Sequence, residues 1–190
     1  ALVEAAVQLV REEGPAGITL REAARRAGVT HAAPYRHFAD KQALLAAVAE
    51  EGFLALRDFV EQAIVDRGDV GALEAAGLAY VSFARDNPSQ FRVMFGDQLR
   101  DKSSYPELMR VDQAVFDLIT GVIEKAQRRG DVASGEPAGL ALVAWSMVHG
   151  VASLAVDGQM DRVGLQGDQV DALVGRVVAT IHAGIQRRTT

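Results

Sequence analysis

The sequence predicts an all-α fold, in which a three-helix helix-turn-helix head precedes a helical bundle, with about nine helices in total. Hydrophobic residues make up 49% of the 190 positions and recur at helical spacings of three and four. The chain has only five prolines, and it lacks the apolar/polar alternation that is typical of strands. We place the head at residues 1–45 and the bundle at residues 46–190.

The first predicted helix runs from about Ala1 to Glu13. Its apolar residues Leu2, Ala6 and Leu9 share one face, and Gly14-Pro15 ends it. Because the sequence begins inside this helix, we expect a flexible arm to precede it.

Two short helix signals follow, joined by a glycine turn. Thr19 can cap the first one, with Glu22 completing a capping box, and Gly28 ends it. Thr30 is a second N-cap candidate, ahead of a short helical segment at 31–38. Two helices joined by such a turn form the motif that places its second helix in the major groove of DNA.

Six further helices are expected, each with an apolar stripe at steps of three and four. Asp40 caps the first of them, Arg67-Gly68 ends it, and Asn87-Pro88 separates the next two. The six predicted helices span about 41–66, 70–86, 88–95, 106–129, 137–156 and 169–186.

The last two predicted helices, 137–156 and 169–186, are apolar on most sides and therefore need covering on most sides. The simplest account is a homodimer in which both helices meet their symmetry mates in a four-helix bundle. The alternative is an ordinary monomeric core, since alanine-rich helices often simply fill bundles.

The formal net charge of −5 is unevenly distributed. Residues 1–45 carry six Lys or Arg and five Asp or Glu, a balance of +1, whereas residues 46–190 carry fourteen and twenty, a balance of −6. An acidic bundle with a mildly basic head is compatible with a local phosphate footprint.

Several classes of protein are disfavoured. The chain has no cysteine and only four widely spaced histidines, and it has no glycine-rich nucleotide motif, so we expect no enzyme, no cofactor and no metal site. We find no run of eighteen apolar residues free of charge and no signal peptide, which predicts a soluble cytoplasmic protein with no membrane partner.

The head resembles that of the TetR family of bacterial one-component transcriptional repressors. The resemblance covers roughly residues 1–48 and lies in T-L-R-E-A-A-R-R-A-G-V-T-H-A-A-P-Y-R-H-F-A-D-K, where an aromatic-x-His-Phe group precedes Lys and an apolar helix. Trp145, His149 and Gly150 are similar to a C-terminal subgroup named for Trp, His and Gly. This resemblance implies a DNA-binding head and a bundle that dimerises and binds a ligand.

The expected DNA-binding residues come from two arguments. In a helix-turn-helix, the first turn of the second helix meets base edges, which selects residues 30–33. The resemblance adds a base contact at Arg21, a groove position for Tyr35, and phosphate contacts at His37 and Lys41. The full candidate set is Thr19, Arg21, Thr30, His31, Ala32, Ala33, Tyr35, His37 and Lys41.

Some residues of the head also have a purely structural interpretation without DNA contact. Arg25, Arg26 and Arg36 could form a solvated face, and Tyr35 could be half-buried core. Pro34 departs from the family, which usually has an aliphatic side chain there, and it forfeits a hydrogen bond in the first turn.

The predicted effector site consists of aromatic and soft side chains that are spread over the bundle. Trp145 and His149 are favoured because they lie one helical turn apart and bring polar groups to an apolar helix. The alternative for every member is a plain hydrophobic core. The candidates are Phe59, Tyr80, Phe83, Phe91, Met94, Phe95, Phe116, Trp145 and His149.

We therefore expect a homodimer whose two heads bind a palindromic double-stranded DNA operator. A small, largely apolar effector molecule would enter the bundle, move the helix at 41–66 and release the DNA. Repression follows from the family resemblance alone. The alternative function is a helical scaffold that binds another protein and has no role on DNA.

Overall fold

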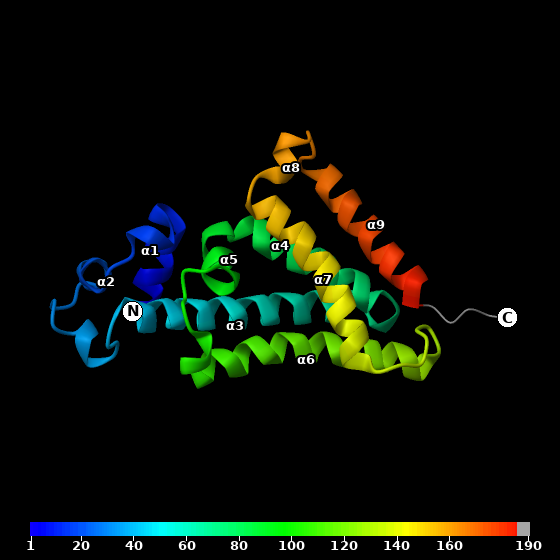
Figure 1. Ribbon diagram of the computed structural model, residues 1–190, viewed down its shortest axis with the longest axis horizontal. Coiled ribbons are helices and arrows are strands. Elements are labelled where there is room, and N and C mark those ends of the chain that lie inside the picture. The colour runs from blue at the N-terminus through cyan, green and yellow to red at the C-terminus, as the bar shows by residue number, and fades with distance from the viewer. Residues whose placement is uncertain (186–190) are drawn as a thin grey trace. The chain divides into compact units, whose positions relative to one another are not determined.

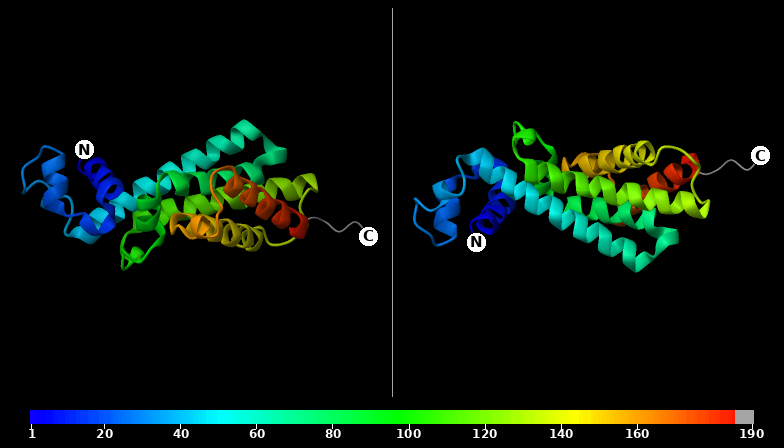
Figure 2. Two further views of the ribbon diagram at one scale, coloured as in Figure 1. Left: turned by 90° about the horizontal axis from the view of Figure 1, so that it is seen from above. Right: turned by 90° about the horizontal axis from the view of Figure 1, so that it is seen from below.

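A computed structural model describes residues 1–185, and the side chains up to residue 180. The described part contains helices and loops and no strand, which confirms the all-α prediction (Figures 1 and 2). The α-helices are α1 (Leu2–Gly17), α2 (Leu20–Arg26), α3 (Lys41–Arg67), α4 (Ala72–Asp86), α5 (Pro88–Phe95), α6 (Pro106–Arg129), α7 (Pro137–Val156), α8 (Gln159–Arg162) and α9 (Asp168–Ile185). Three 3₁₀ turns are η1 (Pro34–Arg36), η2 (Asp69–Gly71) and η3 (Lys102–Ser104).

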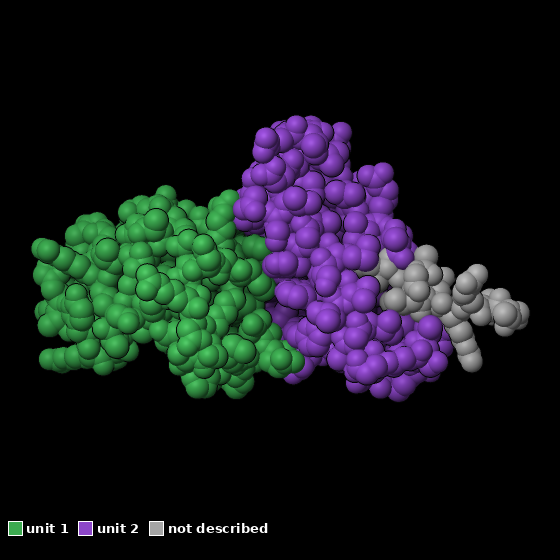
Figure 3. Space-filling view, in the orientation of Figure 1, with its two compact units in different colours: residues 1–55, 87–113 green, residues 56–86, 114–190 purple. Residues whose placement is uncertain are grey.

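The chain divides into two compact units (Figure 3). Unit 1 comprises Ala1–Ala55 and Asn87–Gln113, and unit 2 comprises Leu56–Asp86 and Ala114–Thr190. Helices α3 and α6 contribute residues to both units. This grouping differs from the division predicted at residue 45, because α5 and the chain after it cluster with the head. The functional division into a head and a ligand-binding part stays a prediction.

Unit 1 is built on contacts of α1 with α2 and α5. Gly14 interrupts α1 with φ 75° and ψ 171°, a conformation that suits glycine. The predicted break is therefore confirmed at Gly14, although one more helical turn follows it before α1 ends at Gly17. Gly52 of α3 brings that helix close to α5, since a Cβ on Gly52 would lie only 2.6 Å from the sulfur of Met94. The first half of α3 contributes Leu44, Leu45, Ala46, Val48, Ala49 and Phe53 to the buried core.

The segment after Gly28 differs from the predicted helix at 31–38. Only the 3₁₀ turn η1 forms, held by hydrogen bonds from Arg36 N–H to Ala33 C=O and from His37 N–H to Pro34 C=O. Pro34 has no N–H, so the bond that would close the first α-helical turn cannot form. The lost hydrogen bond is the one expected at Pro34, but its effect is larger than expected, because no α-helix forms in this segment.

Unit 2 is formed by α4, α7 and α9, which contact one another in pairs, with α8 packed on α7. Gly77 of α4 allows close approach of α9, because a Cβ there would lie 2.8 Å from a methyl carbon of Val178. Ala144, Val148 and Ala152 of α7 are buried in this unit. Residues 181–186 of the last predicted helix lie outside the described side chains.

Helix α7 corrects one sequence argument. Its 20 residues contain no Asp, Glu, Lys or Arg, so a charge-free stretch of more than eighteen residues does exist, and its length and composition alone would allow it to cross a membrane. Such a helix also occurs in the cores of soluble proteins. Six of its residues are buried, whereas Leu142 and Leu154 are 51% and 49% exposed. This helix therefore presents an apolar face that unit 2 leaves uncovered.

Candidate functional site

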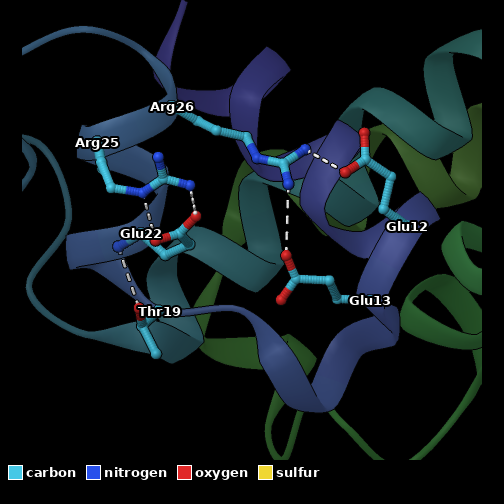
Figure 4. A network of polar contacts seen from close by, with 6 residues as sticks. All are labelled: Glu12, Glu13, Thr19, Glu22, Arg25 and Arg26. Carbon is cyan, nitrogen blue, oxygen red and sulfur yellow. Dashed lines mark hydrogen bonds and ion pairs between the residues drawn. The ribbon is translucent and has the colours of Figure 1, made fainter.

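Helix α2 is held at its start and along its surface by the network in Figure 4. The hydroxyl of Thr19 accepts a hydrogen bond from the Glu22 N–H at 3.1 Å, as the predicted cap requires. Arg25 binds the carboxylate of Glu22 through Nε at 2.9 Å and through a second nitrogen. This hydrogen bonding lowers the pKa of Glu22, against a smaller opposing effect of burial. Thr19 therefore has a structural role in capping α2.

Arg26 joins α2 to α1. Its guanidinium lies 2.5 Å from a carboxylate oxygen of Glu12 and 3.3 Å from one of Glu13 (Figure 4). Together with the Arg25 pair, this contact compensates two of the cations that the sequence concentrates near α2. For Arg25 and Arg26 we therefore favour the interpretation that they are surface charges. Acidic neighbours engage both side chains.

Arg21 and Arg36 differ from these two arginines. Both are exposed, and within residues 1–185 the structure gives neither of them an acidic partner. Tyr35 is 62% exposed, so its alternative interpretation as half-buried core is wrong. His31 and His37 are exposed as well. The segment from α2 through η1 therefore presents two uncompensated cations and three polar rings to solvent.

The remaining candidates of residues 30–33 lie between the Gly28 turn and Pro34. Gly28 has φ 68°, a left-handed conformation that favours glycine. Thr30, His31 and Ala32 are exposed, whereas Ala33 is half-buried. The exposed three could reach a base edge, but the alanines offer only methyl contacts.

Lys41 is engaged within the unit. Its Nζ donates a hydrogen bond to the carbonyl of Ala16 at 3.0 Å, which ties the start of α3 to the end of α1. Asp40 caps the same helix by accepting from the Ala43 N–H at 2.9 Å. A phosphate contact by Lys41 therefore requires its ammonium to leave or share the Ala16 carbonyl.

The predicted effector residues fall into two separate groups. Phe91, Met94 and Phe95 belong to unit 1, and the other six belong to unit 2. In unit 1, the Phe95 ring lies 4.7 Å from that of Phe91 and 5.2 Å from that of Phe53, between centroids. Lys102 Nζ lies 5.6 Å from the Phe95 centroid. The sequence argument missed Phe53 and Lys102, because their pairing depends on tertiary contacts.

Three of the predicted residues in unit 2 form a polar cluster. The hydroxyl oxygen of Tyr80 lies 2.8 Å from Nδ1 of His149, and Trp145 Nε1–H donates to the same oxygen at 3.3 Å. Tyr80 and Trp145 line a cavity of about 40 Å³, whose remaining lining is apolar: Leu73, Ala76, Gly77, Ile119, Ala144, Val148 and Val178. A space of that size holds about one water, so an organic ligand would need it to open.

A larger groove of about 690 Å³ lies in unit 2 among residues of α3, α4 and α9. Phe59 lines it and lies 6.3 Å from Phe83, between ring centroids. Arg67 and Glu74, also in the lining, form an ion pair at 3.1 Å. The sequence argument missed the polar lining residues Gln62, Asp66, Ser82 and Asp171. Phe116 is half-buried on α6 and lines neither of these two spaces.

Comparison with known proteins gives two family matches. Residues 2–48 match the family described as bacterial regulatory proteins, tetR family, and residues 73–181 match that described as Tetracyclin repressor-like, C-terminal domain. The subgroup named for Trp, His and Gly stays a prediction.

Solved structures share the fold over nearly the whole chain. A protein of unknown function from Rhodococcus sp. RHA1 is 34% identical over 98% of this chain and 94% of its own, with a TM-score of 0.85. The TetR family transcriptional regulator PfmR from Thermus thermophilus is 18% identical over 98% and 99%, with a TM-score of 0.70. The regulator FadR from Bacillus subtilis, in complex with stearoyl-CoA, is 15% identical over 97% and 98%, with a TM-score of 0.76.

Proposed function

The chain belongs to the tetR family of bacterial regulatory proteins, and from that premise we propose that it is a cytoplasmic repressor that binds a palindromic operator as a homodimer. A small, largely apolar effector releases it from DNA. Repression is the activity that the family resemblance implies.

The exposed segment from α2 through η1 carries the DNA-binding part of this proposal. Arg21 and Arg36 are cations without an acidic partner among the described residues, in a chain whose other head arginines 25 and 26 are paired. Cations that are free of protein partners can neutralise phosphates or bind guanine edges without first breaking an ion pair. His31, Tyr35 and His37 add ring and hydroxyl groups beside them.

The apolar face of α7 supports the homodimer. Leu142, Val143, Met147 and Leu154 are all exposed on this one helix. A contiguous apolar surface on a helix is covered in dimers by the same surface of a second copy. Two heads held by a dimer would meet half-sites about one helical turn of DNA apart, or slightly more.

The effector part rests on unit 2. Tyr80 and Trp145 place two hydrogen-bonding groups at the wall of an otherwise apolar cavity, and His149 binds the Tyr80 hydroxyl from behind that wall. This combination suits a ligand that is mostly apolar and has one polar end. Opening that cavity would displace α4 or α7, and α3, which has residues in both units, would carry the change to the heads.

Binding to duplex DNA tests the proposal directly. An operator selected from random duplexes should be palindromic, and the logarithm of the binding constant should fall linearly with the logarithm of salt concentration. Lys41→Ala should reduce that slope by about one if Lys41 leaves Ala16 to bind a phosphate. Absence of duplex binding at low salt would favour the protein-binding scaffold.

A matched pair of variants tests the effector site. A thermal-shift screen of apolar compounds should find ligands that raise the melting temperature of the parent chain, because a ligand that binds only the folded state stabilises it. Tyr80→Phe should weaken ligands whose polar end binds the hydroxyl, whereas Tyr105→Phe, which removes the same group in unit 1, should not. Equal shifts in both variants would remove Tyr80 from the site.

A further inference from the structure

The connection between α5 and α6, residues 96–105, belongs to unit 1 together with α1, α2 and the first half of α3. Most of it is exposed, but Leu99 is buried. A largely polar connection that buries one leucine in its middle is docked on the unit rather than free in solvent. The backbone hydrogen bonds of Gln98 and Arg100, on either side of Leu99, show which element the connection contacts.

Gln42, the second residue of α3, holds this connection with both atoms of its amide. Its Nε2 donates to the carbonyl of Gln98 at 3.1 Å, and its Oε1 accepts from the Arg100 N–H at 3.0 Å. Both partner atoms belong to the backbone, so the contact depends on the position of the connection and not on its side chains. A side-chain amide bound in this way satisfies a donor and an acceptor at once.

Lys102 fastens the far side of the same connection. Its Nζ donates to the carbonyl of Met94 and lies 5.9 Å from the ring centroid of Phe53 and 5.6 Å from that of Phe95. Burial lowers the pKa of Lys102, and Asp112 opposes this effect. An ammonium held between aromatic faces and a helix C-terminus favours one geometry. The connection is therefore anchored both to the start of α3 and to the end of α5.

The start of α3 follows closely after the exposed segment from α2 through η1, residues 20–36, which we call the DNA-facing segment because the proposed function places DNA there. Lys41 binds the carbonyl of Ala16 in α1, and Asp40, four residues after the end of η1, caps α3. The first turn of α3 is thus joined to the DNA-facing segment through the chain and through α1, which packs on α2, and it is joined to the α5–α6 connection through Gln42. A displacement of the connection is resisted by Gln42 and so acts on that turn.

We propose that Gln42 is a positioning residue that couples the α5–α6 connection to DNA binding by the head. The inference rests on the proposed DNA-binding function. Because coupling between two sites is reciprocal, DNA bound at the head must stabilise the Gln42 contact by the same factor by which that contact strengthens DNA binding. One or two hydrogen bonds in a partly exposed site correspond to a factor of roughly 3 to 10.

Hydrogen exchange of the Arg100 amide tests the proposal, because Gln42 Oε1 is the partner that the structure gives this amide. Residue-resolved exchange is measured by NMR in the full chain, with and without a duplex selected from random sequence. In the parent chain, DNA should slow exchange at Arg100 about 3- to 10-fold. In Gln42→Met, which keeps length and removes both hydrogen bonds, exchange should be fast and indifferent to DNA, and DNA affinity should fall by the same factor.

Two further variants separate coupling from folding. Gln98→Ala keeps the backbone carbonyl that Gln42 binds and should behave like the parent chain. Gln42→Glu keeps the acceptor for the Arg100 N–H and loses the donor to the Gln98 carbonyl, so it should retain part of the DNA-dependent protection. This variant keeps the proposal testable if Gln42→Met does not fold.

The outcomes distinguish the inference from the function. A parent chain that binds DNA without any change at Arg100 overturns the coupling alone, and so does full DNA-dependent protection in Gln42→Met. A parent chain that binds no duplex overturns the proposed function together with the inference.

Discussion

The two compact units expose opposite kinds of surface. Among its described residues, unit 1 engages four of the six head cations, which are Arg11, Arg25, Arg26 and Lys41. It leaves Arg21 and Arg36 without an acidic partner, beside exposed polar rings. Unit 2 pairs Arg67 and Arg85 with carboxylates and leaves the apolar face of α7 open. The two units therefore suit different partners: unit 1 presents cations and polar rings to solvent, and unit 2 presents an apolar helix face.

The largest effect is expected from charges placed on the apolar face of α7. Leu142→Glu combined with Leu154→Glu should raise the dimer dissociation constant at least about 100-fold, since burying an unpaired charge costs several kcal/mol. Sedimentation velocity over a range of concentrations measures it. Val70→Glu is the matched control, because Val70 is 91% exposed and lies outside α7. A doubly substituted chain that still sediments as a dimer would place the interface elsewhere.

Two arginines of α2, one with an acidic partner and one without, test the role of the uncompensated cations in unit 1. Arg21→Ala should weaken operator binding by about 1–3 kcal/mol, because a free cation is removed from the DNA-facing segment. Arg25→Ala should cost less than about 1 kcal/mol, because Glu22 already engages that side chain. Fluorescence anisotropy with a labelled operator compares them. Equal losses for both would show that the Glu22 pair opens on DNA.

Two glycines test how tightly the α5–α6 connection is held in unit 1. A Cβ on Gly96 would lie 2.4 Å from the backbone carbonyl oxygen of Arg92, so Gly96→Ala should lower the free energy of unfolding by about 1–2 kcal/mol. Gly121 of α6 has no atom within 4 Å of such a Cβ, and Gly121→Ala should raise it by about 0.5–1 kcal/mol. Urea titrations measure both changes. A neutral Gly96→Ala would mean that the connection adapts freely.

The smallest expected effect concerns Glu50, a half-buried acid in unit 1. Burial, with Glu107 and Glu51 nearby, raises the pKa of Glu50 above its ordinary value of 4.5. A carboxyl with a raised pKa in the folded chain favours folding at low pH, and this contribution is lost as the pH rises through the folded pKa. Glu50→Gln should therefore stabilise the chain at neutral pH by no more than about 0.5 kcal/mol.

Melting temperatures measured across pH check the Glu50 prediction. The advantage of Glu50→Gln should shrink as the pH falls and vanish below the ordinary pKa of 4.5, where both chains carry a neutral side chain. A gain that persists unchanged in acid would point to packing and not to charge.

Local signals predicted most of the fold. Gly14, Gly28 and Gly68 have positive φ at or near expected helix ends, and Pro88, Pro106 and Pro137 begin three helices. Two elements differ from the prediction: the short helix α8 was not predicted, and a 3₁₀ turn, η1, replaces a helix. Pro34 was a visible signal there, but the size of its effect depends on the tertiary contacts that bury it.

The candidate site was less accessible to sequence reasoning. The pair of Glu22 with Arg25 follows helical spacing and could have been found, whereas the contacts of Arg26 with Glu12 and Glu13 join two helices. Gln42 has no recognisable pattern, since its partners lie 56 and 58 residues away along the chain. Contacts between side chains that are far apart in the sequence depend on the tertiary fold, and they produce no periodic pattern in the sequence.

The short turn η1 has a thermodynamic consequence. A turn closed by bonds such as that from the Arg36 N–H to the Ala33 carbonyl has fewer hydrogen bonds than a full α-helix, and we expect it to open at lower free energy. DNA would then order this segment as it binds, and the association would carry an entropic penalty and a negative heat-capacity change. Calorimetry at several temperatures would record operator recognition as a partial folding reaction.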